Sequence, residues 1–240
     1  MAIWARIRTP PPEQAMEQHL NSPVVASHRR MSDPAFRADM QEHRYDDHVE
    51  PLNRLIDDLI ATRNRWMPQI SPHHGGVNAE VLLLLAAPGV GCDDQDGSEG
   101  SGFLCVENDD PTAELLATCL DRAELDASRT VCWNAFPWII PGYKTPTEVQ
   151  VRSATEPLYR FIELLPDLHA VVLLGRMAEV SWQQLKERRR DATLGPLVVK
   201  APLPSGRGIT KGGKQSRSAG EDEVVNALVQ ARVHCDRFRR

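Results

Sequence analysis

The chain of 240 residues lacks any long hydrophobic run. No stretch reaches the roughly 18 consecutive apolar residues that a membrane-spanning helix requires. The opening residues, MAIWARIRTPPPEQ, contain no long apolar region behind their first charges, so the sequence predicts no secretory signal. We therefore expect a cytoplasmic protein that has no membrane partner.

Cysteine pairs of the C-x-x-C type are also missing. The five cysteines are Cys92, Cys105, Cys119, Cys132 and Cys235. An odd number without a secretory signal is typical of reduced thiols in a cytoplasm. Zinc ribbons and iron–sulfur clusters need closely spaced cysteines, so neither is expected. His73 and His74 are adjacent in a glycine-rich turn, which is a weak metal-binding pattern, and we expect no metal and no nucleotide cofactor.

An overall excess of positive charge is absent as well. The net charge is -5, whereas proteins that bind nucleic acid are often basic, so any such binding must rely on a local patch. Residues 201–240 provide one, with eight Lys or Arg against four Asp or Glu. Residues 93–126 are the opposite, with eleven acidic residues and only Arg122. We expect that stretch to turn away from DNA, except for carboxylates with a catalytic role.

Apolar runs alternate with amphipathic segments from residue 80 onward. We expect strands over 80–87, 130–136, 170–175 and 197–201, and helices over 112–125, 148–165 (which Pro157 could interrupt), 178–190 and 221–233. This alternation predicts a three-layer α/β fold, with a central, mainly parallel four-stranded sheet and helices on both faces. Residues 1–76 would form an N-terminal extension whose amphipathic helix, within 45–66, packs on an α/β domain of residues 77–240.

In such a sheet the ligand site lies outside the carboxyl ends of the strands. That rule selects the turn at 86–96, residues 134–138, Gly175 with Arg176, and the loop from Pro202. The turn APGVG has neither Gly-rich phosphate-binding pattern, so a plain strand-to-helix turn explains it as well as a ligand site does. An enzyme that uses a small nucleotide is disfavoured for the same reason.

Asn134 follows the second apolar run, in the stretch TVCWNAFPW. Its amide offers donors and an acceptor, which suits reading the edge of a base, although an asparagine often fixes its own loop instead. The nearby Trp133, Phe136 and Trp138 would either pack in the core or wall an aromatic pocket.

Taken in chain order, five short motifs resemble the uracil-DNA glycosylase superfamily, over residues 78–210. They are AAPG (86–89), GSGFL (100–104), the helix-to-strand unit that ends in TVCWNAFPW (113–138), LPDLHAVVLLGRMAEVSW (165–182) and PLPSGRGI (202–209). The resemblance implies an enzyme that rotates one nucleotide out of DNA, reads its base in a pocket and directs water at the sugar carbon. It also implies a DNA partner, and we expect a monomer.

The resemblance implies a role for each matching position. Phe103 would stack on the base and Asn134 would bind its edge, in a pocket completed by Ala87, Pro88 and Gly89. Backbone amides around Gly89 to Gly91 would steady the sugar or the leaving group. The DNA-binding positions would be Ser205, Gly206, Arg207, Ile209, Lys211 and Lys214, with either Arg207 or Ile209 filling the vacated stack.

Three positions depart from the family pattern. Ala86 and Ala87 stand where the family commonly has an acidic residue or asparagine, and Leu203 replaces its histidine. One interpretation is that Asp93 or Asp94 orients the water instead. The other is a catalytically silent DNA-binding module.

The same departures bear on the substrate. A base pocket with fewer uracil-specific hydrogen-bonding groups and more room favours a damaged or modified base as the substrate. One example is a hypermodified phage base that is excised in antiviral defence. An ordinary uracil-excision repair enzyme is the alternative.

Overall fold

The computed structural model describes residues 28–95, 99–189 and 195–239. Its α-helices are α1 (Pro34–Glu42), α2 (Glu50–Arg63), α3 (Pro111–Arg122), α4 (Glu148–Ser153), α5 (Thr155–Ile162), α6 (Arg176–Arg188), α7 (Gly206–Ile209) and α8 (Arg217–Cys235). Its strands are β1 (Gln69–Ile70), β2 (Val81–Leu85), β3 (Phe103–Leu104), β4 (Thr130–Asn134), β5 (Ala170–Leu174) and β6 (Leu197–Ala201). Short 3-10 helices include η3 (Gly76–Asn78), η4 (Val90–Cys92) and η5 (Ala127–Arg129). None of the helices described is both long and apolar enough to cross a membrane.

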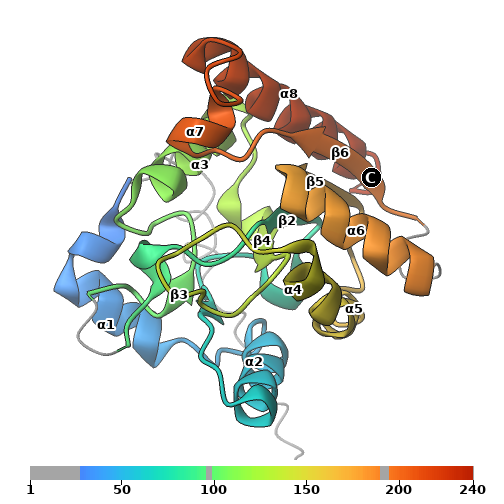
Figure 1. Ribbon diagram of the computed structural model, residues 1–240. Coiled ribbons are helices and arrows are strands. Elements are labelled where there is room, and N and C mark those ends of the chain that lie inside the picture. The colour runs from blue at the N-terminus through green and yellow to red at the C-terminus, as the bar shows by residue number, and fades with distance from the viewer. Residues whose placement is uncertain (1–27, 96–98, 190–194, 240) are drawn as a thin grey trace, which may run out of the picture.

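The central sheet has four strands in the order β4-β2-β5-β6, and every neighbouring pair is parallel (Figure 1). Strand β2 pairs with β4 so that Leu85 lies opposite Asn134. Every residue of β2, β4 and β5 is buried, which explains why these strands appear as continuous apolar runs in the sequence. The predicted four-stranded parallel sheet is therefore confirmed.

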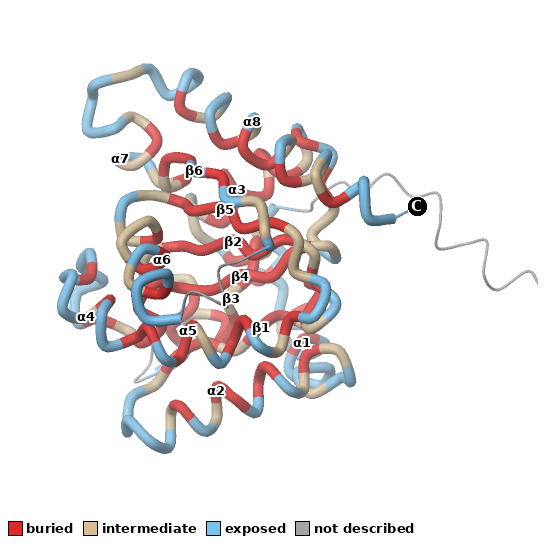
Figure 2. The backbone as a smooth tube through the Cα atoms, turned by 90° about the vertical axis from the view of Figure 1, so that its right-hand side faces the viewer, coloured by how far each residue is buried: buried red, intermediate tan, exposed pale blue. Residues whose placement is uncertain are grey.

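Helices cover both faces of the sheet, so the molecule has three layers. Alternate residues of β2 point to opposite faces. Leu82 and Leu84 share one core cluster with α2, α5 and α6, whereas Leu83 shares the other with α3 and α8. Figure 2 shows the buried strands between α8 and α2. The predicted arrangement of a parallel sheet with helices on both faces is therefore confirmed.

Two of the predicted helices differ most from the structure. The helix expected over 148–165 is two helices, α4 and α5, which meet at Ala154. Pro157 lies in the first turn of α5, where proline needs no amide partner, so the break precedes it by three residues. Helix α8 begins at Arg217, because the Ser216 side chain caps the Ala219 amide.

The N-terminal segment packs on the domain through α2. Leu52, Ile56 and Leu59 of this helix belong to the same core cluster as one face of the sheet. Helix α1 lies beside the two-stranded parallel sheet of β1 and β3, and Phe36 and Met40 form a separate small cluster with Phe103. Residues 1–27 of the predicted extension lie outside the described residues.

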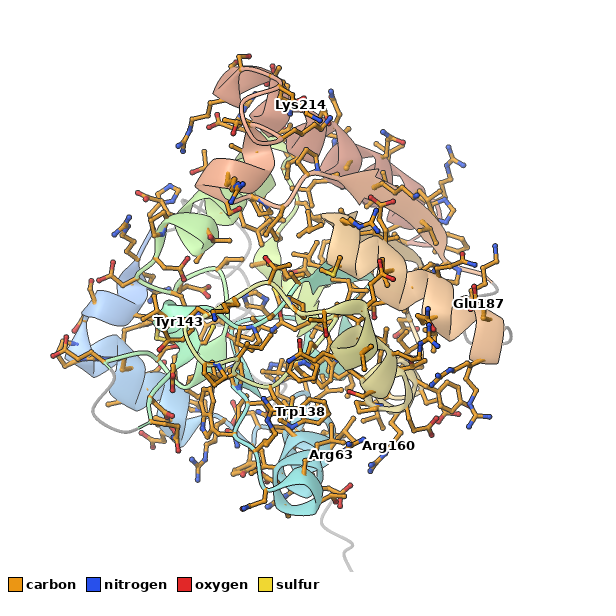
Figure 3. The ribbon with its side chains drawn as sticks, in the orientation of Figure 1. Arg63, Trp138, Tyr143, Arg160, Glu187 and Lys214 are labelled. Carbon is orange, nitrogen blue, oxygen red and sulfur yellow. The ribbon has the colours of Figure 1, made fainter. Side chains whose placement is uncertain are left out.

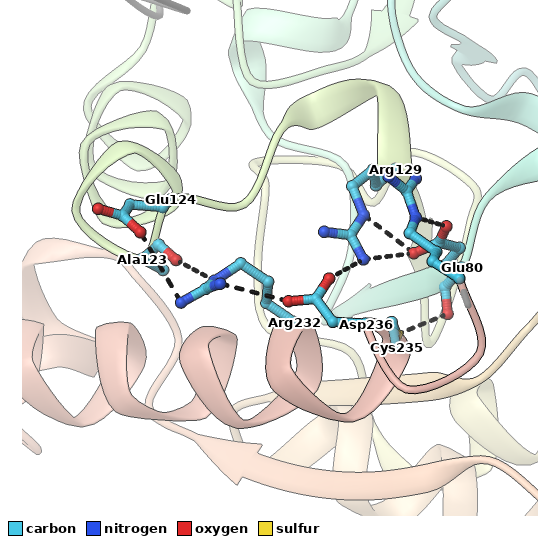
Figure 4. Close-up of polar contacts among 8 residues, drawn as sticks. Glu80, Ala123, Glu124, Arg129, Arg232, Cys235 and Asp236 are labelled. Atoms are coloured by element: carbon cyan, nitrogen blue, oxygen red, sulfur yellow. Dashed lines mark hydrogen bonds and ion pairs between the residues drawn. The ribbon is translucent and has the colours of Figure 1, made fainter.

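An ion-pair network joins the C-terminal end of the described chain to the amino edge of the sheet (Figure 4). Glu80, just before β2, accepts from Arg129 at 2.6 Å and also from Arg239. Arg129 bridges to Asp236 at 2.8 Å. The network fixes the end of α8 against the start of β2, at the opposite edge of the sheet from the carboxyl ends of its strands.

Candidate functional site

A pocket of about 130 Å³ lies at the carboxyl ends of β2 and β4. The turn after β2 supplies Ala86, Ala87 and Gly89, and the loop after β6 supplies Leu203. The side chains in the lining that can react or hydrogen-bond come from the end of this turn and from two further segments: Cys92, Cys105, Asn108, Asp110, Cys132 and Asn134. The pocket is therefore where the strand order predicts a ligand site.

Asn134 is the last residue of β4 and is 1% exposed. Neither its Oδ1 nor its Nδ2 has a hydrogen-bond partner in the part of the chain that the structure describes. Burying an amide without partners costs about 1–3 kcal/mol, so native proteins rarely keep one without a use for it. This amide does not fix its own loop, and it lines the pocket with a free donor and a free acceptor.

Asp110 is the carboxylate that lines the same pocket. It caps α3, because its Oδ1 accepts from the amides of Thr112 at 2.8 Å and Ala113 at 3.1 Å. Its Oδ2 faces Gly91, where a Cβ atom would approach to 2.5 Å. Asp110 was not predicted as a site residue, although an aspartate before a proline at the start of an amphipathic helix is a visible cap signal.

Asp93 and Asp94 do not line this pocket. Asp93 is 8% exposed, and its two oxygens accept from the Tyr143 hydroxyl at 3.0 Å and the Gln95 amide at 3.1 Å. Asp94 is exposed and accepts from the Gln95 side chain at 2.6 Å. The structure therefore gives the predicted pair a local role in the loop after η4, and the carboxylate near Asn134 is Asp110.

The predicted base-binding residues are only partly brought together. Ala87 and Gly89 line the pocket with Asn134, whereas Pro88 is buried and is not part of the lining. Phe103 is 1% exposed and packs in the cluster around Met40, so its ring does not line the pocket. Its neighbour Leu104 does.

The aromatic residues around Asn134 belong to the core. Trp133 stacks on Phe161 with ring centroids 4.1 Å apart, and Phe136 meets Trp138 edge to face at 5.3 Å. All three of Trp133, Phe136 and Trp138 are at most 2% exposed and belong to the cluster that contains α2. Of the two interpretations, core packing describes them, and none of them lines the pocket.

The predicted DNA-binding loop contains α7. Ser205 caps this helix by accepting from the Gly208 amide at 3.2 Å, and Gly206 is exposed. Ile209 is fully buried in the core beside α8, so of the two residues proposed to fill a vacated stack only Arg207 is exposed. The remaining candidates are Lys211 and Lys214.

These cations differ in their partners. Lys211 pairs with Glu223 at 2.8 Å, whereas Arg207 and Lys214 have no acidic partner among the described residues. Lys214 lies at one tip of the molecule (Figure 3). A second pocket, of about 370 Å³, opens between α6 and α7 and shares the wall residue Leu203 with the first.

No protein-family model matches the chain, and no curated protein matches it. Within the described ranges, no group of three or more His, Cys, Asp or Glu side chains is arranged to hold a metal ion.

Proposed function

We propose that the protein is a DNA glycosylase that binds a flipped base in the Asn134 pocket and hydrolyses its bond to the sugar. The observation that carries the proposal is the buried Asn134 amide, which is unpartnered at both ends and lines a pocket at the strand ends. A donor beside an acceptor matches the edge of a lactam ring. The order of motifs that resembles the uracil-DNA glycosylase superfamily, and the parallel sheet with helices on both faces, support the same proposal.

In this mechanism Asp110 takes the role first expected of Asp93 or Asp94. The Asp110 Oδ1 accepts the hydrogen bonds from the first turn of α3, which fix the carboxylate. Its Oδ2 faces the turn at Gly91. A fixed carboxylate at this place would orient the attacking water and stabilise positive charge on the sugar as the bond breaks. Asn134 would bind the leaving base.

The proposed substrate is a damaged or modified base, including a hypermodified phage base, and not plain uracil. The support is the wall formed by Ala86, Ala87 and Leu203, none of which offers a side-chain hydrogen bond to a ring oxygen. Specificity would then depend on Asn134 and on the shape of the wall.

The test is cleavage at abasic sites in duplexes that carry uracil, deaminated bases or hypermodified bases, scored after alkali treatment. We expect product from a modified duplex, and a loss of about 100-fold or more in rate for Asp110→Asn, the scale typical of a lost acid–base or electrostatic group. Asparagine is as good a helix cap as aspartate, so this variant should fold.

Asp109→Asn is the matched control, because Asp109 is the adjacent, half-exposed aspartate that pairs with Arg29. It should keep full activity. Excision of uracil alone would contradict the modified-base proposal, and equal rates for Asp110→Asn and wild type would remove Asp110 from the mechanism.

A catalytically silent DNA-binding module is the second candidate. It is favoured by the hydrogen bonds that both Asp93 oxygens accept, because these bonds fix the carboxylate first expected to be catalytic to Tyr143 and Gln95. In that case no duplex in the panel yields abasic sites, while DNA binding persists in wild type and in Asp110→Asn alike. Gel-shift and cleavage assays on the same preparations separate the two candidates.

A further inference from the structure

Three of the cysteines line the Asn134 pocket: Cys92, Cys105 and Cys132. Asn108 holds the first two, since the Cys105 Sγ donates to its Oδ1 at 3.3 Å and its Nδ2 donates to the Cys92 Sγ at 3.3 Å. Cys132 has a different neighbour. It lies on β4 two residues before Asn134, on the same face of the strand, and it interacts with the imidazole of His74.

His74 is part of a buried pair with Glu107. The His74 side chain is fully buried, and its Nε2 lies 3.4 Å from the Glu107 Oε2, on a carboxylate whose side chain is 12% exposed. The Val106 amide also lies 3.5 Å from this nitrogen, the far limit of a hydrogen bond. The Glu107 Oε2 has no hydrogen-bond partner among the described residues, so its contact with His74 is an ion pair and not a hydrogen bond. The Nδ1 atom has no hydrogen-bond partner in the described structure.

The charges in this cluster favour an imidazolium. Burial alone would lower the pKa of His74, but Cys132 and Glu107 outweigh burial and raise this pKa to about 10. Burial would raise the pKa of Glu107, but His74 outweighs it and lowers this pKa to about 2. By contrast, burial raises the pKa of the Cys92 thiol to about 12 and raises that of Cys105 well above its ordinary value.

We propose that Cys132 is a nucleophile at the floor of the Asn134 pocket, with His74 as its imidazolium partner and Glu107 orienting His74. A thiolate beside a histidinium that is held by a third polar group is an arrangement that activates cysteine. The ligand class is a small planar ring with an amide or imide edge, which Asn134 binds, and an electron-poor carbon–carbon double bond. The assignment requires the pocket but not base excision, so the two activities can fail separately.

The reaction with such a ring is a conjugate addition. The thiol proton leaves to water, and the sulfur forms a bond to one carbon of the double bond. The π electron pair moves to the other carbon, which then takes a proton from water. Nothing is oxidised or reduced, and no group leaves. The groups facing the sulfur or sharing its pocket are His74, Cys92, Cys105 and Asp110, with Glu107 behind His74.

The probe is maleimide, a flat ring that carries an imide N–H edge and an electron-poor double bond. Full-length protein would be treated briefly at pH 7, quenched with excess thiol and digested, and the labelling rate of each cysteine followed by mass spectrometry. We expect Cys132 to react at least about ten-fold faster than Cys92 and Cys105, because of these three pocket thiols only Cys132 has His74 as a neighbour. Equal or slower labelling of Cys132 would overturn the proposal.

Variants can distinguish activation of the Cys132 thiol by His74 from simple accessibility of this thiol to the probe. His74→Gln should slow labelling of Cys132 about ten-fold, whereas His73→Gln, the same change at the adjacent half-exposed histidine, should not. N-ethylmaleimide lacks the imide N–H, so Asn134→Ala should slow maleimide more than N-ethylmaleimide. If His74→Gln does not fold, wild-type selectivity and the Asn134→Ala comparison decide alone, and the absence of both effects would reject the nucleophile.

Discussion

At the scale of single residues, the turn after β2 contains two glycines with opposite tolerances. A Cβ atom at Gly91 would lie 2.5 Å from the Asp110 Oδ2, whereas at Gly89 it meets nothing within 4 Å. We expect Gly91→Ala to destabilise the protein by about 1–3 kcal/mol, the usual cost of overpacking, and to displace the Asp110 carboxylate. Urea unfolding of Gly91→Ala and Gly89→Ala measures the difference. Equal unfolding free energies would mean that the Asp110 side chain moves aside freely.

Some residues of the candidate site could be predicted from the sequence, and others could not. Asn134 was predicted because a polar residue at the end of a buried strand must face the carboxyl edge of the sheet. The burial of Phe103 and Ile209 in the core was not predicted, because the direction of a side chain depends on packing against distant partners. Phe103 meets Met40 of α1, and Ile209 meets the core beside α8. Asp110 was overlooked because a helix cap has the same sequence signal whether or not a ligand lies beside it.

At the scale of elements, the network around Glu80 makes the start of β2 and the end of α8 sensitive to acid. Burial would raise the pKa of Glu80, but hydrogen bonds from Arg129 and Arg239 outweigh it and lower this pKa. A folded-state pKa below the unfolded value means that the stabilisation is complete above the unfolded value, about 4.3, and is lost as pH falls through the folded value. Glu80→Gln should therefore cost about 1–3 kcal/mol at pH 7 and much less at pH 3.

Urea unfolding of wild type and Glu80→Gln at both pH values tests this expectation. Glu179→Gln is the control, since Glu179 pairs with Lys200 in a more exposed position and such pairs contribute little. A penalty for Glu80→Gln that is unchanged at pH 3 would show that packing, and not the charge of Glu80, fixes the two elements.

The elements themselves were predicted in proportion to their length and burial. The strands of the central sheet were found because burial on both faces demands an unbroken apolar run. Strands β1 and β3 were missed, since two residues each cannot establish a period of two. The break between α4 and α5 was anticipated at Pro157 but occurs at Ala154, because proline favours the first turn of a helix over its interruption.

At the scale of the whole molecule, the alternation of strands and helices along the sequence predicted the fold class, but it did not predict the order of the strands in the sheet. The third strand, β5, lies on the opposite side of β2 from β4, and this reversal brings the turn after β2 beside both Asn134 and Leu203. Alternation of strands and helices allows several orders, and tertiary packing selects one. The pocket therefore depends on contacts between segments more than a hundred residues apart, which no local pattern encodes.

The net charge of -5 implies that any DNA-binding surface is a local one. The salt dependence of the DNA-binding affinity can show where that surface lies. Each phosphate contact contributes about 0.9 to the slope of log affinity against log salt, so the double variant Arg207→Ala with Lys214→Ala should flatten the slope by roughly 2. Lys211→Ala should change it less, because Lys211 is already paired with Glu223. Fluorescence anisotropy with a labelled duplex, over a series of salt concentrations, gives the slopes.

Arg160→Ala is the control for loss of a cation elsewhere. Arg160 pairs with Asp58 on the side of the molecule away from Lys214 (Figure 3), so its removal should leave the slope unchanged. If the double variant keeps the wild-type slope, the loop around α7 is not the DNA-binding surface. If Arg160→Ala flattens the slope as much as the double variant does, binding is diffuse over the surface. A slope that falls only for the double variant places the phosphate backbone across the loop beside Leu203, at the mouth of the Asn134 pocket.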